Sequence, residues 1–333
     1  MSLKLSALDK LWIYSDPTFQ DLIIRCEIDL VGQISKSQFI KIIKNNLLVK
    51  YERLNHIFQS DGTTKRTEID FDYHVIDHHE EIFLSSEFPL WRFFLESDAQ
   101  NTKITLLIHH GLADGVSLVR LLREICGEEN KTRPLKKRLF SEVSSILKGT
   151  KFIRILLSAK KLNTSLIKSK FSVIHKEKAY NFRFEEALED FALRHETDLP
   201  LDSLIMMPIR MDYFFGKTFN NFFGNQIAMV PIKFGKNLSK ELDRHVKSKG
   251  YKAVFLLSNL LIYLPTYFRN RLLEALKTRV SALVTLIEIS KRPLFLDGKE
   301  ILEIRAWSPT YQSQILASTY ISYCNKITIC TSK

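Results

Sequence analysis

The sequence predicts a layered fold of the α/β (α+β) class, in which strands and helices alternate along most of the chain. A period-two pattern from Leu22 to Leu30 indicates a half-buried strand, and residues 88–95 and 102–108 form two neighbouring apolar runs joined by a polar turn. A helical pattern follows directly, from Val116 to Ile125. With 333 residues, the chain is long enough for two packed lobes.

The remaining elements of the first half follow from local signals. Ser35 precedes apolar residues at helical spacing and is expected to cap a helix there. Residues 68–75 alternate and predict a further strand. The helix that begins near Val116 should end at Gly127, since glycine is the usual residue after a helix terminus.

The second half shows the same mixture of helices and strands. We expect helices over residues 185–194, 238–248 and 251–276, the last interrupted at Pro265. Strands are predicted for residues 204–210, 226–234, 282–289, 300–307 and, in pieces, 311–329.

The charge distribution suggests three segments: an N-terminal lobe over residues 1–130, a basic amphipathic linker over 131–178 and a C-terminal lobe over 179–333. Residues 134–178 contain twelve Lys or Arg and two Glu, which accounts for most of the net charge of +12. This segment is interpreted as a solvated helix face covering the core, as a surface for an anionic membrane, or as a contact for the phosphates of an anionic ligand. No nucleic-acid-binding motif accompanies the charge, so no nucleic-acid partner is expected.

The composition argues against several classes of protein. Hydrophobic residues make up 45% and charged residues 26%, which is ordinary for a globular chain, and the four cysteines are too scattered for a disulfide framework. No signal peptide is recognisable at the N-terminus. The uncharged run from Ala253 to Phe268 contains Pro265 and is too short to span a bilayer. We therefore expect a cytoplasmic protein, with peripheral membrane or lipid-body contact as an extension of that view.

The most informative stretch is His109-His110-Gly111-Leu112-Ala113-Asp114-Gly115, between a predicted buried strand and a helix. A histidine fixed at that point is a suitable general base, because its intrinsic pKa of ~6.5 leaves much of it neutral at pH 7. Asp114 could cap the helix or pair with an arginine, and the glycines permit a sharp turn. The plain alternative is a pair of hydrogen-bonded histidines before an ordinary turn. His74, His78 and His79 lack the spacing of a metal site, so no metal is expected.

This motif resembles the HHxxxDG signature of the acyl-CoA-dependent acyltransferase superfamily, which includes chloramphenicol acetyltransferase and the condensation domains of peptide synthetases. The chain is most similar to the bacterial wax ester synthase/acyl-CoA:diacylglycerol acyltransferase branch. The further segments that carry the likeness are Leu5-Ser6-Ala7-Leu8-Asp9, Phe71-Asp72-Tyr73-His74-Val75, Pro89-Leu90-Trp91, Gly224-Asn225-Gln226 with Val230-Pro231, and Trp307-Ser308-Pro309.

The resemblance implies two chloramphenicol-acetyltransferase-like lobes with mixed sheets and an active site in a tunnel between them. It implies His110 as the base, with acyl-CoA as co-substrate entering from one side and an alcohol or lipid acceptor from the other. Asp114 and Gly115 complete the catalytic motif, with Arg53 or Arg210 as the partner of Asp114. His109, Asn225, Gln226 and Trp91 are assigned to substrate binding, and no metal is implied.

The sequence also departs from the family pattern. The chain is short between the histidine motif and Gly224, and the family's Asn-Asp pair is present only as Asn181-Phe182. The family's threonine-asparagine stretch is reduced to Thr285-Leu286-Ile287-Glu288-Ile289, and the arginine expected after Met207-Pro208-Ile209 is shifted to Arg210. These changes affect the segments expected to contact substrate.

The leading interpretation is an O-acyltransferase that transfers a fatty acyl group from acyl-CoA to diacylglycerol or a long-chain alcohol. Two alternatives remain. One is a condensation-like enzyme that forms amides or esters, because a histidine base serves an amine as well as an alcohol. The other is a diverged, non-catalytic protein that binds lipid or acyl-CoA at a membrane surface.

Overall fold

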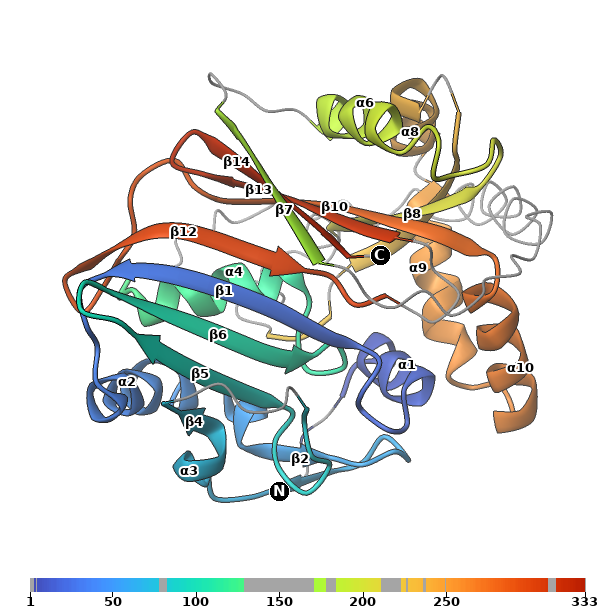
Figure 1. Ribbon diagram of the computed structural model, residues 1–333. Coiled ribbons are helices and arrows are strands. Elements are labelled where there is room, and N and C mark those ends of the chain that lie inside the picture. The colour runs from blue at the N-terminus through green and yellow to red at the C-terminus, as the bar shows by residue number, and fades with distance from the viewer. Residues whose placement is uncertain are drawn as a thin grey trace.

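Two six-stranded sheets, a two-stranded ribbon and the helices around them make up the described part of the protein (Figure 1). The computed structural model describes residues 3, 5–77, 83–128, 171–177, 184–210, 223–225, 227–235, 238–248, 250–310 and 316–332. Most of the basic segment 131–178 and the Asn181-Phe182 pair lie outside these ranges, so the interpretations given for them remain predictions.

The first sheet is antiparallel except at one edge, where β4 runs parallel to β5. Its strand order is β11 (Phe295–Leu296), β12 (Lys299–Trp307), β1 (Ile23–Val31), β6 (Asn101–His109), β5 (Trp91–Ser97) and β4 (Val75–Ile76). A separate two-stranded ribbon consists of β2 (His56–Phe58) and β3 (Thr64–Arg66).

The second sheet is mixed: its central strand β10 runs parallel to both of its neighbours, and the outer pairs are antiparallel. Its strand order is β7 (Phe171–Glu177), β14 (Lys326–Ser332), β13 (Leu316–Tyr323), β10 (Val280–Ser290), β8 (Leu204–Arg210) and β9 (Ile227–Lys233). The helices α6 and α8 lie on the outer face of this sheet (Figure 1).

The helices begin at the residues that local chemistry favours. Ser6 and Ser35 form capping boxes at the starts of α1 and α2, in which each serine Oγ accepts from the backbone N–H three residues on, and the serine N–H donates to the side chain of that residue. The helices described are α1 (Ala7–Ser15), α2 (Lys36–Ile42) continued by a π-helix (Ile43–Leu48), a 3₁₀ turn (Glu52–Asn55), α3 (Phe71–His74), α4 (Gly115–Ile125), α6 (Phe184–Arg194), α8 (Leu238–Ser248), α9 (Gly250–Leu261) and α10 (Thr266–Lys277).

Two large hydrophobic cores pack against the sheets, and the larger one also includes Ile289, Ile321 and Cys330 of the second sheet. The larger core joins the first sheet to α2 and α4, and the other joins the second sheet to α6 and α8. Strands β11 and β12 come from the C-terminal third of the chain yet extend the first sheet, where β12 pairs with β1. Sheet membership therefore does not follow the order of the chain, and the division at residues 130 and 178 stays a prediction.

Most predicted helices and strands are confirmed, with ends within one to three residues of the expected positions, but one predicted strand is wrong. Residues 68–75 were expected to form a strand, whereas only Val75 of that range does so, together with Ile76 in the short strand β4. The Asp70 side chain accepts hydrogen bonds from the backbone of Asp72 and Tyr73 and so begins the single-turn helix α3. This local capping overrides the alternating pattern.

The end of α4 and the break at Pro265 follow the predictions. Gly127 has a φ of +71° and its N–H bonds to the carbonyl of Glu124, which ends the helix as expected. Pro265 separates α9 from α10. Within the described ranges, no helix is long and apolar enough to cross a membrane.

Candidate functional site

His110 directly follows the last residue of β6, where the first sheet faces the second. The backbone of His109 is still paired with Ile23 of β1, and the N–H of His110 donates to the carbonyl of Leu22 at 2.8 Å. The backbone at the motif is therefore anchored to the sheet. The side chain of His110 then lines a large cavity between the two sheets.

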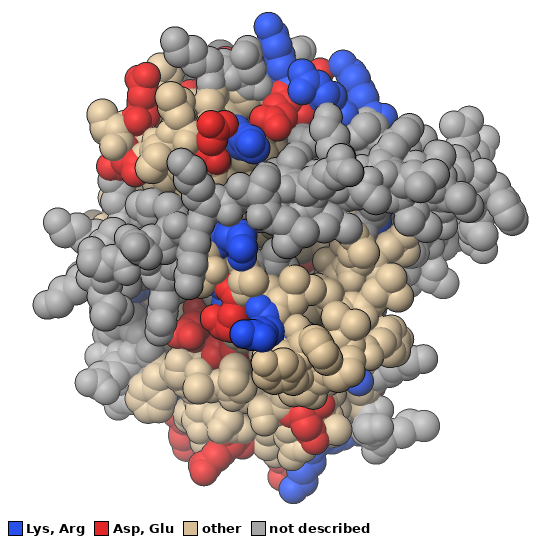
Figure 2. All heavy atoms as spheres, turned by 90° about the vertical axis from the view of Figure 1, so that its right-hand side faces the viewer, with Lys and Arg blue, Asp and Glu red and all other residues tan. Residues whose placement is uncertain are grey.

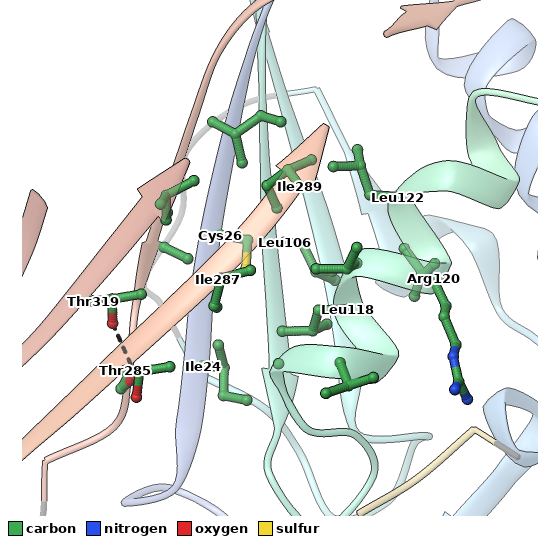
Figure 3. Close-up of a pocket in the computed structure, with 18 of the residues that line it drawn as sticks. Ile24, Cys26, Leu106, Leu118, Arg120, Leu122, Thr285, Ile287, Ile289 and Thr319 are labelled. Atoms are coloured by element: carbon green, nitrogen blue, oxygen red, sulfur yellow. Dashed lines mark hydrogen bonds between the residues drawn. The ribbon is translucent and has the colours of Figure 1, made fainter. Parts of the chain in front are cut away.

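This cavity has a volume of about 1240 Å³ and is bounded by β1, β6 and β12 on one side and by β10 on the other, with α4 along its length (Figure 3). Most of the side chains that line it are apolar. Those labelled in Figure 3 include Ile24, Cys26, Leu106, Leu118, Leu122, Ile287 and Ile289. Arg123, Lys291 and Arg292 line it where β10 and α4 end.

The ring of His110 is held between two side chains. Trp12 stacks on it with ring centroids 4.1 Å apart, and Asn225 Oδ1 lies 2.9 Å from Nδ1. Burial lowers the pKa of His110 to about 4, so the imidazole is neutral at pH 7. With Nδ1 engaged, Nε2 is the nitrogen left for a ligand in the cavity.

Asp9 is the centre of a buried hydrogen-bond network beside this ring. Its Oδ1 accepts from the backbone N and from Nδ2 of Asn225, both at 3.0 Å, and its Oδ2 accepts from Arg53 Nη1 at 2.8 Å. Arg53 Nη2 also donates to the carbonyl of Gly111 at 2.7 Å. The ion pair that the structure describes for Arg53 is thus with Asp9, whereas the sequence suggested Asp114.

His109 points into the core rather than into the cavity. Its side chain is fully buried; Nδ1 accepts from the N–H of Gly111 at 3.0 Å and Nε2 lies 3.2 Å from Asp16 Oδ2. Burial alone would raise the pKa of Asp16, but hydrogen bonds from His109 and from the backbone of Leu22 outweigh it and hold that pKa well below its usual range. The geometry thus gives His109 a role in holding the loop, and His109 is not among the residues that line the cavity.

Asp114 and Gly115 hold the start of α4. Asp114 is fully buried and its side chain accepts from the N–H of Ser117, as an N-cap. A Cβ at Gly115 would lie 3.3 Å from Ile287 Cδ1 on β10, so α4 approaches the second sheet closely there. Ser117 Oγ donates to the carbonyl of Gly224 at 2.7 Å, which ties α4 to the segment that carries Asn225.

Trp91, predicted to bind substrate, is 2% exposed and packs in the core of the first lobe. Its indole N–H donates to the carbonyl of Leu54 at 2.8 Å and its ring stacks on His74. It does not line the large cavity, so the predicted substrate contact finds no support in the geometry. Gln226 and the side chain of Arg210 lie outside the described part of the structure.

Several residues of the site carried no individual signal in the sequence. Trp12 and Asp16 lie on or just after α1, and Asp9 was noted only as the last residue of the segment Leu5 to Asp9, without a role of its own. Thr285, Ile287 and Ile289, which replace the family's threonine-asparagine stretch, line the cavity from β10. The described residues contain no group of three or more His, Cys, Asp or Glu side chains that could hold a metal ion.

The chain is similar to known proteins both in a C-terminal sequence segment and in its fold. Residues 223–332 match the family model of the WS/DGAT C-terminal domain. No curated protein matches the chain. The family match and the folds of the solved structures confirm the resemblance predicted from the motifs.

Three solved structures cover 99–100% of this chain and share its fold. A mutant starter condensation domain of rhizomide synthetase in complex with C8-CoA has a TM-score of 0.66 at 11% identity, with 89% of that chain covered. The wax ester synthase/diacylglycerol acyltransferase from Marinobacter aquaeolei VT8 has a TM-score of 0.57 at 12% identity, with 93% covered. Polyketide synthase associated protein 5 from Mycobacterium tuberculosis has a TM-score of 0.58 at 13% identity, with 92% covered.

These similarities define the class of the fold. The two mixed sheets have the chloramphenicol-acetyltransferase-like arrangement shared by condensation domains and wax ester synthases, as the motifs predicted.

Proposed function

We propose that the protein is an acyltransferase that moves a fatty acyl group from acyl-CoA to an alcohol, with His110 as the general base. One observation supports this proposal most strongly. A neutral, buried histidine, with only its Nε2 left for a ligand, lines a cavity of about 1240 Å³ that is mainly apolar.

The apolar lining supports an alkyl chain as part of the substrate. Ile24, Cys26 and Ile28 of β1 line the cavity at every second residue, so this wall extends about 13 Å along the strand. Leu118, Leu121 and Leu122 of α4 also line it. Each buried methylene contributes about 0.8 kcal/mol, so a cavity of this length favours a fatty acyl group over an acetyl group.

The chemical step requires one base. Nε2 of His110 takes the proton of the acceptor hydroxyl while that oxygen attacks the thioester carbonyl. The C–S bond then breaks, the leaving sulfur takes the proton from His110, and the products are an ester and free CoA. A general base in position contributes about 10²–10⁴-fold to such a rate.

Acyl-CoA is the proposed donor because the basic end of the cavity suits its phosphates. Arg123 is part-buried and donates to the carbonyl of Ile289 at 2.6 Å, and Lys291 and Arg292 lie just beyond it. Along α4, Gly115 and Arg123 are about 12 Å apart. One of the similar structures was determined with C8-CoA.

The test is CoA release from palmitoyl-CoA by the purified protein in the presence of a long-chain alcohol, diacylglycerol or an amine. We expect acceptor-dependent release with the alcohols and a loss of about 10²–10⁴-fold in His110→Ala. Transfer to the amine alone would favour a condensation-like enzyme. Release that does not depend on acceptor, and that is equal in His110→Ala, would contradict the proposal.

We also propose that this cytoplasmic enzyme meets its lipid substrates at an anionic membrane or lipid-body surface, through the turn between α9 and α10. Residues 250–273 contain Lys252, Arg269 and Arg271 and no acidic side chain, although Arg269 is buried against the ring of Tyr14 and does not face solvent. Leu260, Tyr263, Tyr267 and Phe268 are 60–79% exposed there. Figure 2 views the protein from the side on which α10 lies, and much of the described surface is uncharged. Aromatic and basic side chains together favour the membrane interface.

Vesicle sedimentation tests this contact. The double variant Tyr267→Glu, Phe268→Glu is expected to bind vesicles of anionic phospholipid at least severalfold more weakly than the parent. Leu193→Glu, a change at a residue 77% exposed on α6, is the matched control and should bind like the parent. Equal binding by all three proteins would place any membrane contact elsewhere.

A further inference from the structure

Three buried polar side chains from distant parts of the chain form a continuous line that ends at His110. Asp9 on α1 is fully buried, and Asn225 is 3% and His110 9% exposed. Asp9 and Asn225 are 216 residues apart in sequence and are joined by two hydrogen bonds of 3.0 Å. Buried polar groups held this closely define one orientation for each other.

The orientation of the Asn225 side-chain amide follows from its neighbours. Its Nδ2 lies 3.0 Å from Asp9 Oδ1 and 2.7 Å from the carbonyl oxygen of His110. Both neighbours are hydrogen-bond acceptors, so the NH₂ group must face them. The opposite orientation would put the amide oxygen against a carboxylate and a carbonyl. Asn225 therefore directs Oδ1 towards the ring of His110.

The ring nitrogen that faces this oxygen must carry the hydrogen. Asn225 Oδ1 can only accept, so His110 Nδ1, at 2.9 Å, donates. In the neutral ring the lone pair is then on Nε2. We infer that Asp9, acting through Asn225, is a positioning residue that keeps His110 in the tautomer with Nε2 as the base. This role rests on the proposed function of His110, although the tautomer itself does not.

The position of the Asp9 carboxylate is fixed from its other side. Its Oδ2 accepts from Arg53 at 2.8 Å and from the backbone N–H of Ser6 at 2.9 Å, which leaves Oδ1 for Asn225. Arg53 also bonds to the carbonyl of Gly111, the residue after His110. The carboxylate and the histidine loop are thus held by the same guanidinium, with charge-assisted hydrogen bonds.

The tautomer can be measured without any enzyme assay. The ¹⁵N chemical shifts of a histidine ring distinguish a protonated from an unprotonated nitrogen, so ¹⁵N-histidine-labelled parent protein should show a protonated Nδ1 and an unprotonated Nε2 at His110, assigned by its loss in His110→Gln. Asn225→Ala removes the side-chain acceptor of Nδ1, and the fraction of ring protonated at Nε2 is expected to rise. Asp9→Asn should have the same effect, because one amide oxygen cannot serve Arg53 and Asn225 together.

The kinetic expectation separates positioning from general damage. Asn225→Ala and Asp9→Asn should each lower kcat by roughly 10–10²-fold with little change in KM, because substrate binding does not need the tautomer. If Asp9 acts through Asn225, Asp9→Asn should cost little further activity when Asn225→Ala is already present. Ser35→Ala is the control: it breaks the corresponding capping box at the start of α2, which is not part of this network, so it lowers the melting temperature without changing kcat or the tautomer.

The outcomes are distinct. A His110 ring that keeps Nδ1 protonated in both variants overturns the inference, as do losses in kcat that multiply in the double variant. If the protein shows no acyl transfer, the proposed function fails while the ¹⁵N measurement still decides the tautomer. Should Asp9→Asn not fold, Asn225→Ala carries the test, since it leaves the Arg53–Asp9 ion pair in place.

Discussion

Nδ1 of His110 lies 2.9 Å from Oδ1 of Asn225, which is 115 residues further along the chain. This contact joins the histidine motif at the end of β6 to the segment that leads into β9 of the second sheet. The same segment is tied to α4 through Ser117 and Gly224. The histidine is therefore held by both halves of the chain, and its geometry depends on how the two sheets meet.

The pH dependence of activity should reflect the burial of His110. Burial lowers its pKa from 6.5 to about 4, so the neutral base persists as pH falls and is lost only near pH 4. The acid limb of kcat/KM is expected near pH 4, measured with acyl-CoA and an alcohol between pH 3.5 and 8. Circular dichroism at each pH separates protonation from unfolding. A midpoint near 6.5, the value of an exposed histidine, would contradict this prediction.

Cys26 should be a wall of the cavity and not a nucleophile. Burial raises the pKa of its thiol to about 12, which leaves almost no thiolate at neutral pH. Cys26→Ala is therefore expected to keep the parent's activity.

A larger side chain at position 26 should change the preference for acyl length. Cys26→Phe projects into the cavity, and the loss of room for two methylenes costs about 1.6 kcal/mol, or roughly tenfold. The measurement is kcat/KM for a series of acyl-CoA donors in Cys26→Ala and Cys26→Phe. If Cys26→Phe lowered kcat/KM equally for donors of all lengths, the result would argue against an acyl chain beside this residue.

Removal of one member of the Arg53–Asp9 ion pair should strongly destabilise the protein. Arg53 is 5% exposed and Asp9 fully buried, so Arg53→Leu leaves a buried carboxylate without its counter-charge. We expect the free energy of unfolding to fall by about 3–5 kcal/mol in urea titrations.

An exposed ion pair provides the control for this measurement. Lys247 and Asp243 form an i,i+4 pair on α8 with side chains 79% and 51% exposed. Lys247→Leu should change the free energy of unfolding by less than about 1 kcal/mol. Similar losses in the two variants would show that the buried network contributes less than its geometry suggests.

The two glycines of the motif should differ in their tolerance of alanine. A Cβ at Gly111 would lie 2.9 Å from His109 Nδ1 and 3.0 Å from Ile13 Cγ1, both in the core. A Cβ at Gly115 would meet only the flexible end of Ile287, at 3.3 Å. Gly111→Ala is expected to lower the free energy of unfolding by about 1–3 kcal/mol, and Gly115→Ala to stay within about 1 kcal/mol of the parent, by thermal or urea denaturation. Equal effects would contradict this reading of the turn.

Much of the fold could be predicted from periodicity and caps. The strand from Leu22 to Leu30, the helix that ends before Gly127 and the break at Pro265 all appear within a few residues of their expected positions. These signals are local: alternation, a capping side chain and a residue without an N–H act over a few positions. The strand predicted at residues 68–75 failed for the same kind of reason, because the Asp70 cap is also local and is stronger than the alternation.

The site was only partly predictable. His110 and the N-cap Asp114 were found from one motif, because strand, turn and helix are adjacent there. His109 and Trp91 were assigned to substrate, yet both are packed in the core, and no sequence pattern distinguishes a buried polar residue with internal partners from one that faces a cavity. The pairing of Asp9 with Asn225 over 216 residues has no local signature at all.

The sequence by itself determined the classes of element and the helix starts, since each depends on neighbours in the chain, and the resemblance of its histidine motif to a known signature singled out His110. Only the tertiary structure decided that β12 extends the first sheet, that Arg53 pairs with Asp9, and that Asn225 meets the ring of His110. These relationships depend on which buried donors and acceptors come within hydrogen-bonding distance when the two sheets pack. That distance is set by the packing of the whole core and not by any short segment.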